Sequence, residues 1–201
     1  MTAVEATTEA EAAGQRSQRA DAVKNRLRIL EAADDVFAAQ GVSAPVDVVA
    51  EKAGVGVGTL YRHFPTKESL IEAVVVTRLE WLVAEMLGAA DSPDPGEALF
   101  SSLHRFARQA ATKRDLFDAL GAAGVDIKAN CADTFALLES AFTQLLDRAV
   151  ASGAVRSDVT ADEVIGLVAG TCMAVTTPGH EQALDRMVDI VCDGLRAPDR
   201  P

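Results

Sequence analysis

Apolar residues recur every three or four positions along most of this chain, and this period limits the possible folds more than any other feature. Such spacing is typical of helices with one buried face, whereas strands place apolar residues at every second position. Runs of alternating β-branched residues bounded by hairpin turns are nearly absent. The sequence therefore predicts an all-α fold. About nine helices are expected, at residues 20–40, 45–53, 57–64, 66–87, 96–111, 113–122, 126–152, 161–176 and 181–196.

Residues that begin and end helices stand at the ends of several of these segments. Gly41 follows the first helix, and Thr66 is a suitable N-cap for the fourth. The sequence TADE at residues 160–163 predicts a capping box at the start of the helix that follows it. Residues 1–17, rich in Ala, Glu and Thr, have the composition of a disordered arm.

Charge is distributed unevenly along the chain. The formal net charge is −11, which argues against a protein that coats nucleic acid over its whole surface. Residues 15–73, however, hold eight Lys and Arg against eight Asp and Glu, whereas residues 74–201 sum to −8. Five basic residues lie between Arg16 and Arg28, so this locally neutral segment is the part able to approach a polyanion.

The remaining composition excludes several classes of protein. Three cysteines, Cys131, Cys172 and Cys192, have no CxxC or metal-ligand spacing and predict free thiols in a reducing compartment. The first residues lack the apolar segment of a signal peptide, and the uncharged run 164–180 contains Pro178, so a membrane span is not expected. No acid–base pair, nucleophile or metal cluster is apparent. We expect a cytoplasmic protein without membrane contact, cofactor, metal or enzymatic activity.

The stretch AGVGVGTLYRHFPTKESL, residues 53–70, has three closely spaced glycines. A phosphate-binding loop would need a Lys and then Ser or Thr directly after its glycines, and a dinucleotide loop would need GxGxxG between a strand and a helix. Here the spacing is GxGxG, and a helix precedes it. The stretch instead predicts two short helices joined by a tight turn at Gly54, which is a helix-turn-helix.

The sequence VDVVAEKAGVGVGTLYRHFPTKESL resembles the DNA-binding signature of the TetR family of bacterial transcription regulators. The resemblance extends from about Arg26 to Val75, and the rest of the chain is similar only in its helical pattern. After the arm at residues 1–17 that composition predicts, it implies a helix-turn-helix DNA-binding domain at 18–73 and a helical effector-binding and dimerisation domain at 74–201. Such proteins are typically homodimers, most often repressors that a small ligand releases from DNA.

Candidate DNA contacts follow from side-chain chemistry and from the resemblance. Thr59, Tyr61 and His63 can each hydrogen-bond a phosphate oxygen, although Tyr61 could instead pack between helices. A cation at Lys67, in the first turn of a helix, is unfavourable unless it faces a phosphate, as the resemblance implies. Leu60 and Phe64 are expected in the core. The further candidates are Val57 for a thymine methyl, Gly58 beside it, Arg62 for a base or phosphate, and Arg26 of the basic cluster for phosphate or the minor groove.

The apolar stripes of residues 74–201 predict first of all a hydrophobic core, which becomes a ligand site only if the helices leave a cavity. A mostly apolar effector is expected, and its identity is open. The candidate ligand contacts are Trp81, His104, Phe117, Cys131, Phe135 and Met173.

The last two expected helices have features of an interface. Small residues recur every four positions in 161–176, and 181–196 has a broad apolar stripe. A two-fold dimer would use both helices, and would place two recognition helices in successive major grooves about 34–36 Å apart. The alternative is that both helices complete a monomer. The candidate interface residues are Gly166, Gly170, Ala174, Leu184, Val188 and Val191.

These observations predict a dimeric repressor that binds a palindromic operator in double-stranded DNA and is released by a small ligand. An activator or a ligand-independent regulator of the same fold would have the same sequence features. A redox sensor based on the three cysteines is a further alternative, although cysteines within apolar helical patterns are usually buried and inert.

Overall fold

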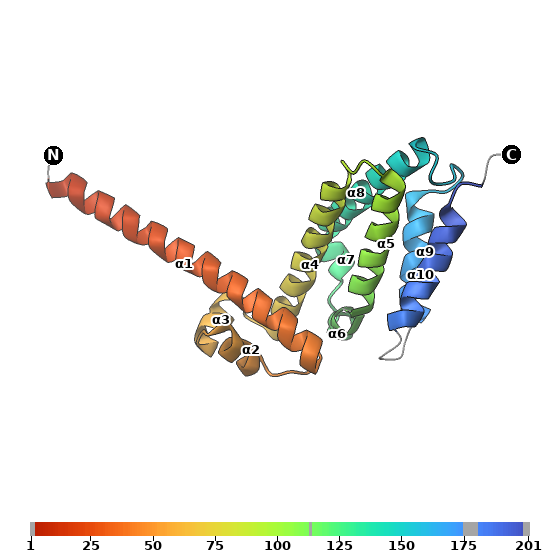
Figure 1. The fold of residues 1–201 in the computed structure, drawn as a ribbon. Helices are drawn as coiled ribbons and strands as arrows, with labels where there is room; N and C mark the ends of the chain where they lie inside the picture. The colour runs from red at the N-terminus through yellow and green to blue at the C-terminus, as the bar shows by residue number, and fades with distance from the viewer. Residues whose placement is uncertain (1–2, 113, 175–180, 199–201) are drawn as a thin grey trace. The chain divides into compact units, whose positions relative to one another are not determined.

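The computed structural model describes residues 3–112, 114–174 and 181–198 of the chain (Figure 1). These residues form ten α-helices and no β-strand, apart from an isolated antiparallel bridge between Val155 and Arg196. The chain divides into two compact units, Met1–Val74 and Val75–Pro201. The all-α prediction is therefore confirmed for the described residues. None of the helices in these residues has the length and apolar character that crossing a bilayer requires.

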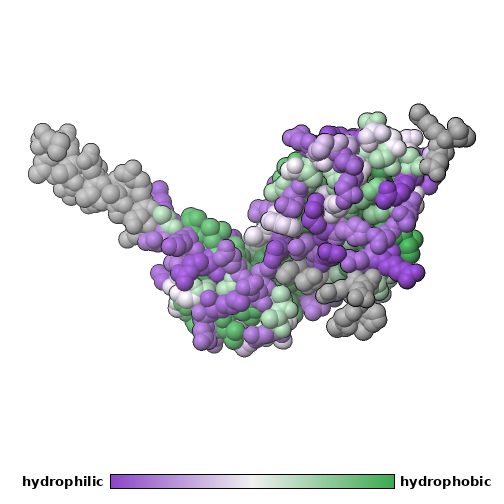
Figure 2. Space-filling model, viewed as in Figure 1, coloured by the Kyte–Doolittle hydropathy of each residue, from purple (hydrophilic) through white to green (hydrophobic). Residues whose placement is uncertain are grey.

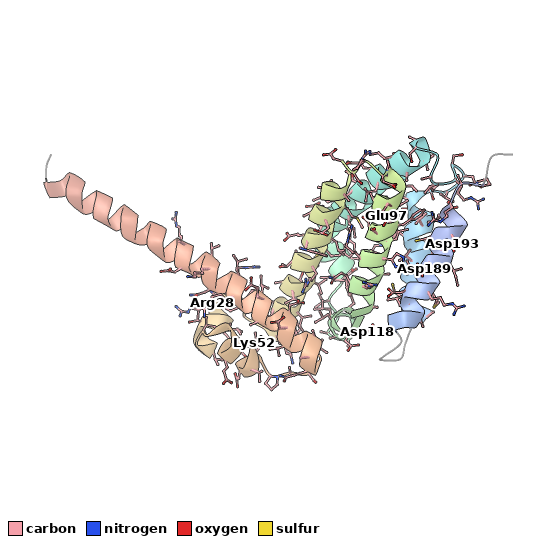
Figure 3. All side chains as sticks on the ribbon, in the orientation of Figure 1. Arg28, Lys52, Glu97, Asp118, Asp189 and Asp193 are labelled. Carbon is pink, nitrogen blue, oxygen red and sulfur yellow. The ribbon has the colours of Figure 1, made fainter. Side chains whose placement is uncertain are left out.

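The first unit contains α1 (Ala3–Gln40), α2 (Val46–Ala53), α3 (Val57–His63) and the first turns of α4 (Lys67–Ala89). Its core forms where the apolar stripe of α1 meets α2 and α3. Lys52 of α2, labelled in Figure 3, also forms an ion pair of 3.0 Å with Asp35 of α1. The fully or almost fully buried residues include Ile29, Ala33, Val36, Val49, Ala50, Leu60 and Leu70.

α1 begins earlier in the chain than expected. The helix starts at Ala3, within the segment for which composition favours a disordered arm, and continues without a break to Gln40. Gly41, with a φ of 75°, follows it. Ala and Glu are among the strongest helix formers, and no proline interrupts this segment. Local helix propensity therefore accounts for the difference.

The second unit contains the rest of α4 and then α5 (Pro95–Thr112), α6 (Arg114–Ala122), α7 (Ile127–Asn130), α8 (Ala132–Ala151), α9 (Ala161–Ala174) and α10 (Glu181–Leu195). α5 is the central helix, because it packs against α8, α9 and α10. Figure 2 shows hydrophilic residues over much of the visible surface, as expected when the apolar stripes face inward. The fully buried side chains here include Leu99, Leu103, Leu120, Phe142, Leu145, Val164 and Val168.

The start of α5 depends on a glycine. An ideal Cβ placed on Gly96 would lie 2.7 Å from the Cβ of Ala154, in the turn that follows α8. Real Cβ atoms do not approach this closely, so only glycine fits without a shift of the backbone. The side chain of Asp94 caps the same helix end by accepting a hydrogen bond of 3.0 Å from the backbone N–H of Glu97.

Two sequence predictions about helix ends have different outcomes. The capping box of α9 is confirmed, since the Thr160 N–H donates to Glu163 Oε2 over 2.8 Å and the Glu163 N–H donates to Thr160 Oγ1 over 3.3 Å. The single helix at 126–152 is wrong. It is divided into α7 and α8 at Cys131, whose φ of −119° and ψ of 29° lie outside the helical region. No proline or glycine marks this interruption in the sequence.

Candidate nucleic-acid interface and effector cavity

The turn between α2 and α3 has the geometry of a helix-turn-helix. Gly54 adopts a left-handed conformation with φ 64° and ψ 37°. The N–H of Gly54 donates to Glu51 O over 3.0 Å, and that of Val55 donates to Ala50 O over 3.0 Å, so carbonyls at the end of α2 are satisfied. An ideal Cβ on Gly54 would also lie 2.5 Å from Nη2 of Arg28. Both the backbone conformation and this neighbour therefore favour glycine.

α3 has one buried face and one exposed face. Leu60 and Phe64 are buried, which confirms their prediction as core residues. Val57 and Tyr61 are 37% and 43% exposed, and a Cβ on Gly58 would meet no other group within 4 Å. Gly56 is the N-cap and provides no side-chain hydrogen bond. The exposed face of α3 therefore presents an aliphatic group, a bare stretch of backbone and a phenol.

The polar side chains of α3 that the sequence predicts as DNA contacts differ in their hydrogen bonding and exposure. Arg62 is exposed, and its guanidinium donates to Thr59 Oγ1 over 3.1 Å and to Gly58 O over 3.4 Å. These two hydrogen bonds hold the Arg62 guanidinium against the exposed surface of α3. Thr59 and His63 are half-buried. Arg62 and Thr59 are thus one hydrogen-bonded pair rather than two independent donors.

Lys67 has a partner within the first unit. Its ammonium donates a hydrogen bond of 2.8 Å to Ala44 O, just before α2, and the side chain is half-buried. This contact explains a cation in the first turn of α4 without a phosphate, so the electrostatic argument for a DNA contact at Lys67 is weaker than the sequence suggested. An ammonium has three donors, however, and one bond to a carbonyl leaves two. At the same helix end Thr66 Oγ1 accepts a bond of 3.1 Å from the Ser69 N–H, which confirms Thr66 as a cap.

One residue of the basic cluster of α1 lies against the end of α3. The guanidinium of Arg26 stands 5.0 Å from the ring centroid of Phe64, at the end of α3. Arg19, Lys24 and Arg28 are exposed, and Arg28 is labelled in Figure 3. The side chain of Arg16 lies outside the described residues. Arg26 is therefore fixed beside α3 by a cation–π contact.

The second unit contains a cavity of about 360 Å³. Its walls come from α4, α5, α6, α7, α8 and α9, and this volume is within the range of small-molecule sites. Two predicted residues, Phe117 and Phe135, line it together with Phe106. The aliphatic lining consists mainly of Val75, Leu79, Leu82, Leu138 and Ile165. The polar lining consists of Arg78, Gln109, Lys128, Glu139 and Asp162.

Four predicted ligand contacts do not line this cavity. Trp81 is 40% exposed on another face of α4, and Met173 is 66% exposed on α9. Cys131 is buried at the junction of α7 and α8, and His104 lies between α5 and α10. The sequence could not anticipate this placement, because an apolar helical pattern identifies a packed face without identifying the space that the face borders. Gln109 and Lys128 were missed, and no local sequence signal marks them.

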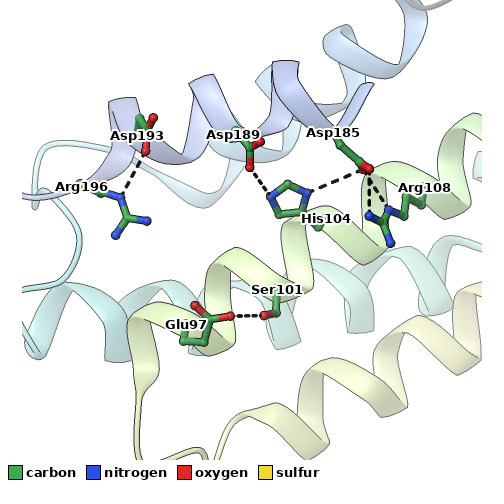
Figure 4. A network of polar contacts seen from close by, with 8 residues as sticks. All are labelled: Glu97, Ser101, His104, Arg108, Asp185, Asp189, Asp193 and Arg196. Carbon is green, nitrogen blue, oxygen red and sulfur yellow. Dashed lines mark hydrogen bonds and ion pairs between the residues drawn. The ribbon is translucent and has the colours of Figure 1, made fainter. Parts of the chain in front are cut away.

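His104 instead belongs to a polar network between α5 and α10 (Figure 4). Its Nε2 lies 3.1 Å from Asp189 Oδ1, and its Nδ1 lies 4.0 Å from Asp185 Oδ1. Arg108 binds both oxygens of Asp185 at 2.9 Å, and this guanidinium holds the pKa of the Asp185 carboxyl below its usual value. His104 thus joins two helices of the second unit.

The exposed faces of α9 and α10 differ from the predicted interface. Gly166, Gly170 and Ala174 are exposed, but Leu184 and Val188 are buried within the protomer and Val191 is half-buried. Leu184 and Val188 pack in the core of the protomer, because α10 uses its stripe against α5 and α9. Three large apolar side chains on these helices are exposed instead: Leu167 (55%), Met173 (66%) and Ile190 (64%).

All three cysteines lie in the described part of the chain, are buried and form no disulfide bond. Burial raises the pKa of the Cys172 thiol, and it raises the pKa of Cys192 to about 11. A buried thiol with a raised pKa is a poor nucleophile, so this geometry argues against the redox-sensor alternative. No group of three or more His, Cys, Asp or Glu with metal-binding geometry occurs in the described part of the chain.

The first unit is thus a helix-turn-helix with an exposed second helix, and the second is a helical unit with a cavity. Together they define the class of helix-turn-helix transcription regulators. Residues 29–74 match the family described as "Bacterial regulatory proteins, tetR family", and residues 94–197 match "Transcriptional regulator SbtR-like, C-terminal domain". The chain belongs to the TetR family of bacterial transcription regulators. Its function is therefore regulatory rather than enzymatic.

Solved structures of this family extend the similarity over most of the chain. A TetR regulator from Streptomyces coelicolor is 37% identical, with a TM-score of 0.72, over 86% of this chain and 98% of that one. Another from Mycobacterium vanbaalenii is 37% identical, with a TM-score of 0.73, over 90% of this chain and 99% of that one. The regulator SrpR of Pseudomonas putida is 47% identical over 64 residues, which are 31% of this chain and 30% of SrpR. Among curated relatives the similarity is thus concentrated in one short segment.

Proposed function

We propose that this protein is a dimeric repressor that binds a palindromic operator in the cytoplasm and leaves it when a small, mostly apolar molecule fills the cavity of the second unit. One observation carries the proposal. Four residues of α4, among them Leu79 and Leu82, line the cavity, and the same continuous helix begins at Lys67 in the unit that contains the helix-turn-helix. A ligand in the cavity therefore acts directly on a helix that enters the DNA-binding unit.

The Lys67 contact supports this route. Because its ammonium bonds to Ala44 O, the first turn of α4 is tied to the segment just before α2. A change in the position of α4 is then transmitted to the helix-turn-helix. The ligand can shift the equilibrium only by its differential affinity for the DNA-bound and released states.

DNA recognition is assigned to the exposed face of α3 and its neighbours. Tyr61 and His63 bind phosphates, and Thr59 does so with Arg62, with which it is paired. Val57 contacts a thymine methyl, and Gly58 lets the backbone approach the bases closely. Lys67 adds a phosphate contact through its remaining donors. Arg26, fixed beside α3, adds another.

Dimerisation is assigned to the exposed face of α9 and α10. Gly166, Gly170 and Ala174 permit close approach of a second backbone, and Leu167, Met173 and Ile190 supply apolar surface to bury. Large exposed apolar side chains are typical of interaction sites when they lie close together. A two-fold axis through this face gives the operator its palindromic symmetry.

The first experiment is selection of fragments from random double-stranded DNA with the purified protein. A palindrome with half-sites about one helical turn apart is expected. Tyr61→Ala should weaken binding to that palindrome, whereas Leu137→Ala, an exposed change on α8, should not. Failure to enrich any palindrome, or equal binding by Tyr61→Ala, would contradict the assignment. Repression is then tested by placing the selected site in a reporter promoter.

A further inference from the structure

From the cavity lining we infer the chemical class of the effector: a neutral aromatic molecule with one hydrogen-bonding oxygen, which the side-chain amide of Gln109 holds. This inference rests on the proposed function, since it concerns the same cavity. It goes further by naming the ligand chemistry and the residue that selects it. Neither follows from membership in the family.

The size and walls of the cavity favour an aromatic molecule. About 360 Å³ corresponds to the liquid volume of about a dozen waters, and so to a ligand with roughly that many non-hydrogen atoms. Phe106, Phe117 and Phe135 reach the cavity from α5, α6 and α8. Aromatic rings favour offset or edge-to-face contact with another ring, and the remaining walls are largely aliphatic.

Gln109 provides a single neutral polar group in this lining. It lies one turn of α5 after Phe106 and is half-buried. Among the groups that the structure describes, none forms a hydrogen bond with its side-chain amide. An amide both donates and accepts, so it matches a phenol, a carbonyl or another amide. A ligand oxygen therefore satisfies an amide to which the described residues of the cavity wall offer no hydrogen-bond partner.

The charged residues of the lining do not favour an ion. Arg78 and Lys128 are cationic, whereas Glu139 and Asp162 are anionic, so the two signs balance. Lys128, Glu139 and Asp162 are exposed and keep their hydration. Arg78 is half-buried but already has an interaction partner within the chain. An ionised ligand would therefore lose its own hydration among the phenylalanines without a counter-ion dedicated to it. A neutral ligand avoids this cost.

The test uses four probes that share one ring system: 2-naphthol, naphthalene, 2-naphthoate and protonated 2-naphthylmethylamine. Binding to the full-length protein, without DNA, is followed by calorimetry and by competition against 2-naphthol fluorescence. We expect 2-naphthol to bind with a Kd of roughly 1–100 µM. The anion and the cation should each bind about tenfold more weakly or worse. Tighter binding of either ion, or no binding of 2-naphthol, would overturn the inference.

The role of Gln109 is tested with Gln109→Leu. Loss of the amide should shift the ratio of the 2-naphthol and naphthalene affinities by about tenfold in favour of naphthalene, because the phenol loses its partner. Retained naphthalene binding shows that the variant cavity is intact. Gln144→Leu is the matched control, an exposed glutamine of α8 outside the lining, and should leave the ratio unchanged. An unchanged ratio in Gln109→Leu would overturn the assignment of that residue.

Failure of the inference and failure of the proposed function give different results. If 2-naphthol binds with the expected selectivity but does not weaken binding to the selected operator, the ligand class is correct and the repressor mechanism is wrong. If 2-naphthoate binds best and releases the operator, the mechanism is correct and the ligand class is wrong.

Discussion

At the scale of single residues, the two most constrained positions are glycines, for different reasons. Gly54 needs a left-handed backbone at the turn of the helix-turn-helix, and the neighbouring Arg28 side chain is long and can move. Gly96 has an ordinary backbone but faces Ala154, whose Cβ is fixed to the main chain. The need for glycine at Gly54 could be predicted from the sequence, because this residue is part of a local motif. The need for glycine at Gly96 could not be predicted, because it depends on a contact between segments that are distant in the sequence.

Gly54→Ala should lower the free energy of unfolding by about 1–2 kcal/mol, because an L-residue is strained at positive φ. Chemical denaturation followed by circular dichroism measures this change. Gly58→Ala is the control in the next helix: its φ lies outside the positive range and its Cβ site is open, so the free energy should stay the same or rise by up to about 1 kcal/mol. Equal effects of the two changes would contradict the argument.

Gly96→Ala should also be destabilising, by about 1–3 kcal/mol, because the new methyl group overlaps the Cβ of Ala154. The matched change Gly88→Ala, within α4, meets no neighbour and should be neutral or slightly stabilising. Thermal unfolding of the two variants provides the comparison. A stabilised Gly96→Ala variant would show that the turn after α8 yields easily.

At the scale of elements, α5 and α10 show what the sequence could predict about helices and what it could not. The period of α10 correctly indicated a buried face, but a stripe does not reveal whether its partner is another helix of the same chain or a second protomer. Leu184 and Val188 were therefore predicted at an interface, whereas they pack in the core. The polar pairs that join the same helices, such as Arg108 with Asp185, are 77 residues apart in sequence. Only the packing brings them together.

The Arg108–Asp185 pair predicts a pH-dependent contribution to stability. The pKa of Asp185 is lower in the folded protein, so its stabilising effect is present above the unfolded pKa and is lost as the pH falls through the folded value. Asp185→Asn should cost up to about 1 kcal/mol at pH 7, because the pair is exposed to solvent.

The measurement is urea denaturation of Asp185→Asn and the parent protein from pH 7 to pH 3. The difference between them should shrink on acidification. Asp147→Asn, an exposed change on α8, is the control and should give no such trend. A difference that grows at low pH would contradict the assigned sign.

At the scale of the whole molecule, the two units differ in how well the sequence anticipated their functional surfaces. The helix-turn-helix was predictable because its turn, cap and core residues lie within a short stretch of the chain. The cavity was not, since residues of six helices surround it. Phe117 and Phe135, which the sequence predicts as ligand contacts, line the cavity because aromatic residues fill space wherever they occur. Gln109 also lines it but was not predicted, because an isolated glutamine has no pattern.

The last prediction concerns the proposed dimer, in which the second unit forms the interface and the first unit binds DNA. Leu167→Glu introduces a charge into the exposed face of α9 and should yield a monomer in sedimentation experiments. Operator affinity should then fall by about 10²-fold or more, because each recognition helix binds alone. Leu137→Glu, a comparably exposed leucine on α8, should remain dimeric. A monomeric parent protein, or a dimeric Leu167→Glu variant, would exclude this face.

The open position at Gly58 has a consequence for the history of the protein. A Cβ there would extend from the exposed face of α3 without meeting a neighbour within 4 Å, and the backbone would not be strained. A single codon change could therefore add a new base contact while the core, the cavity and the cap of the helix stay as they are. After gene duplication, two copies that respond to the same compound could in this way come to control different sets of genes.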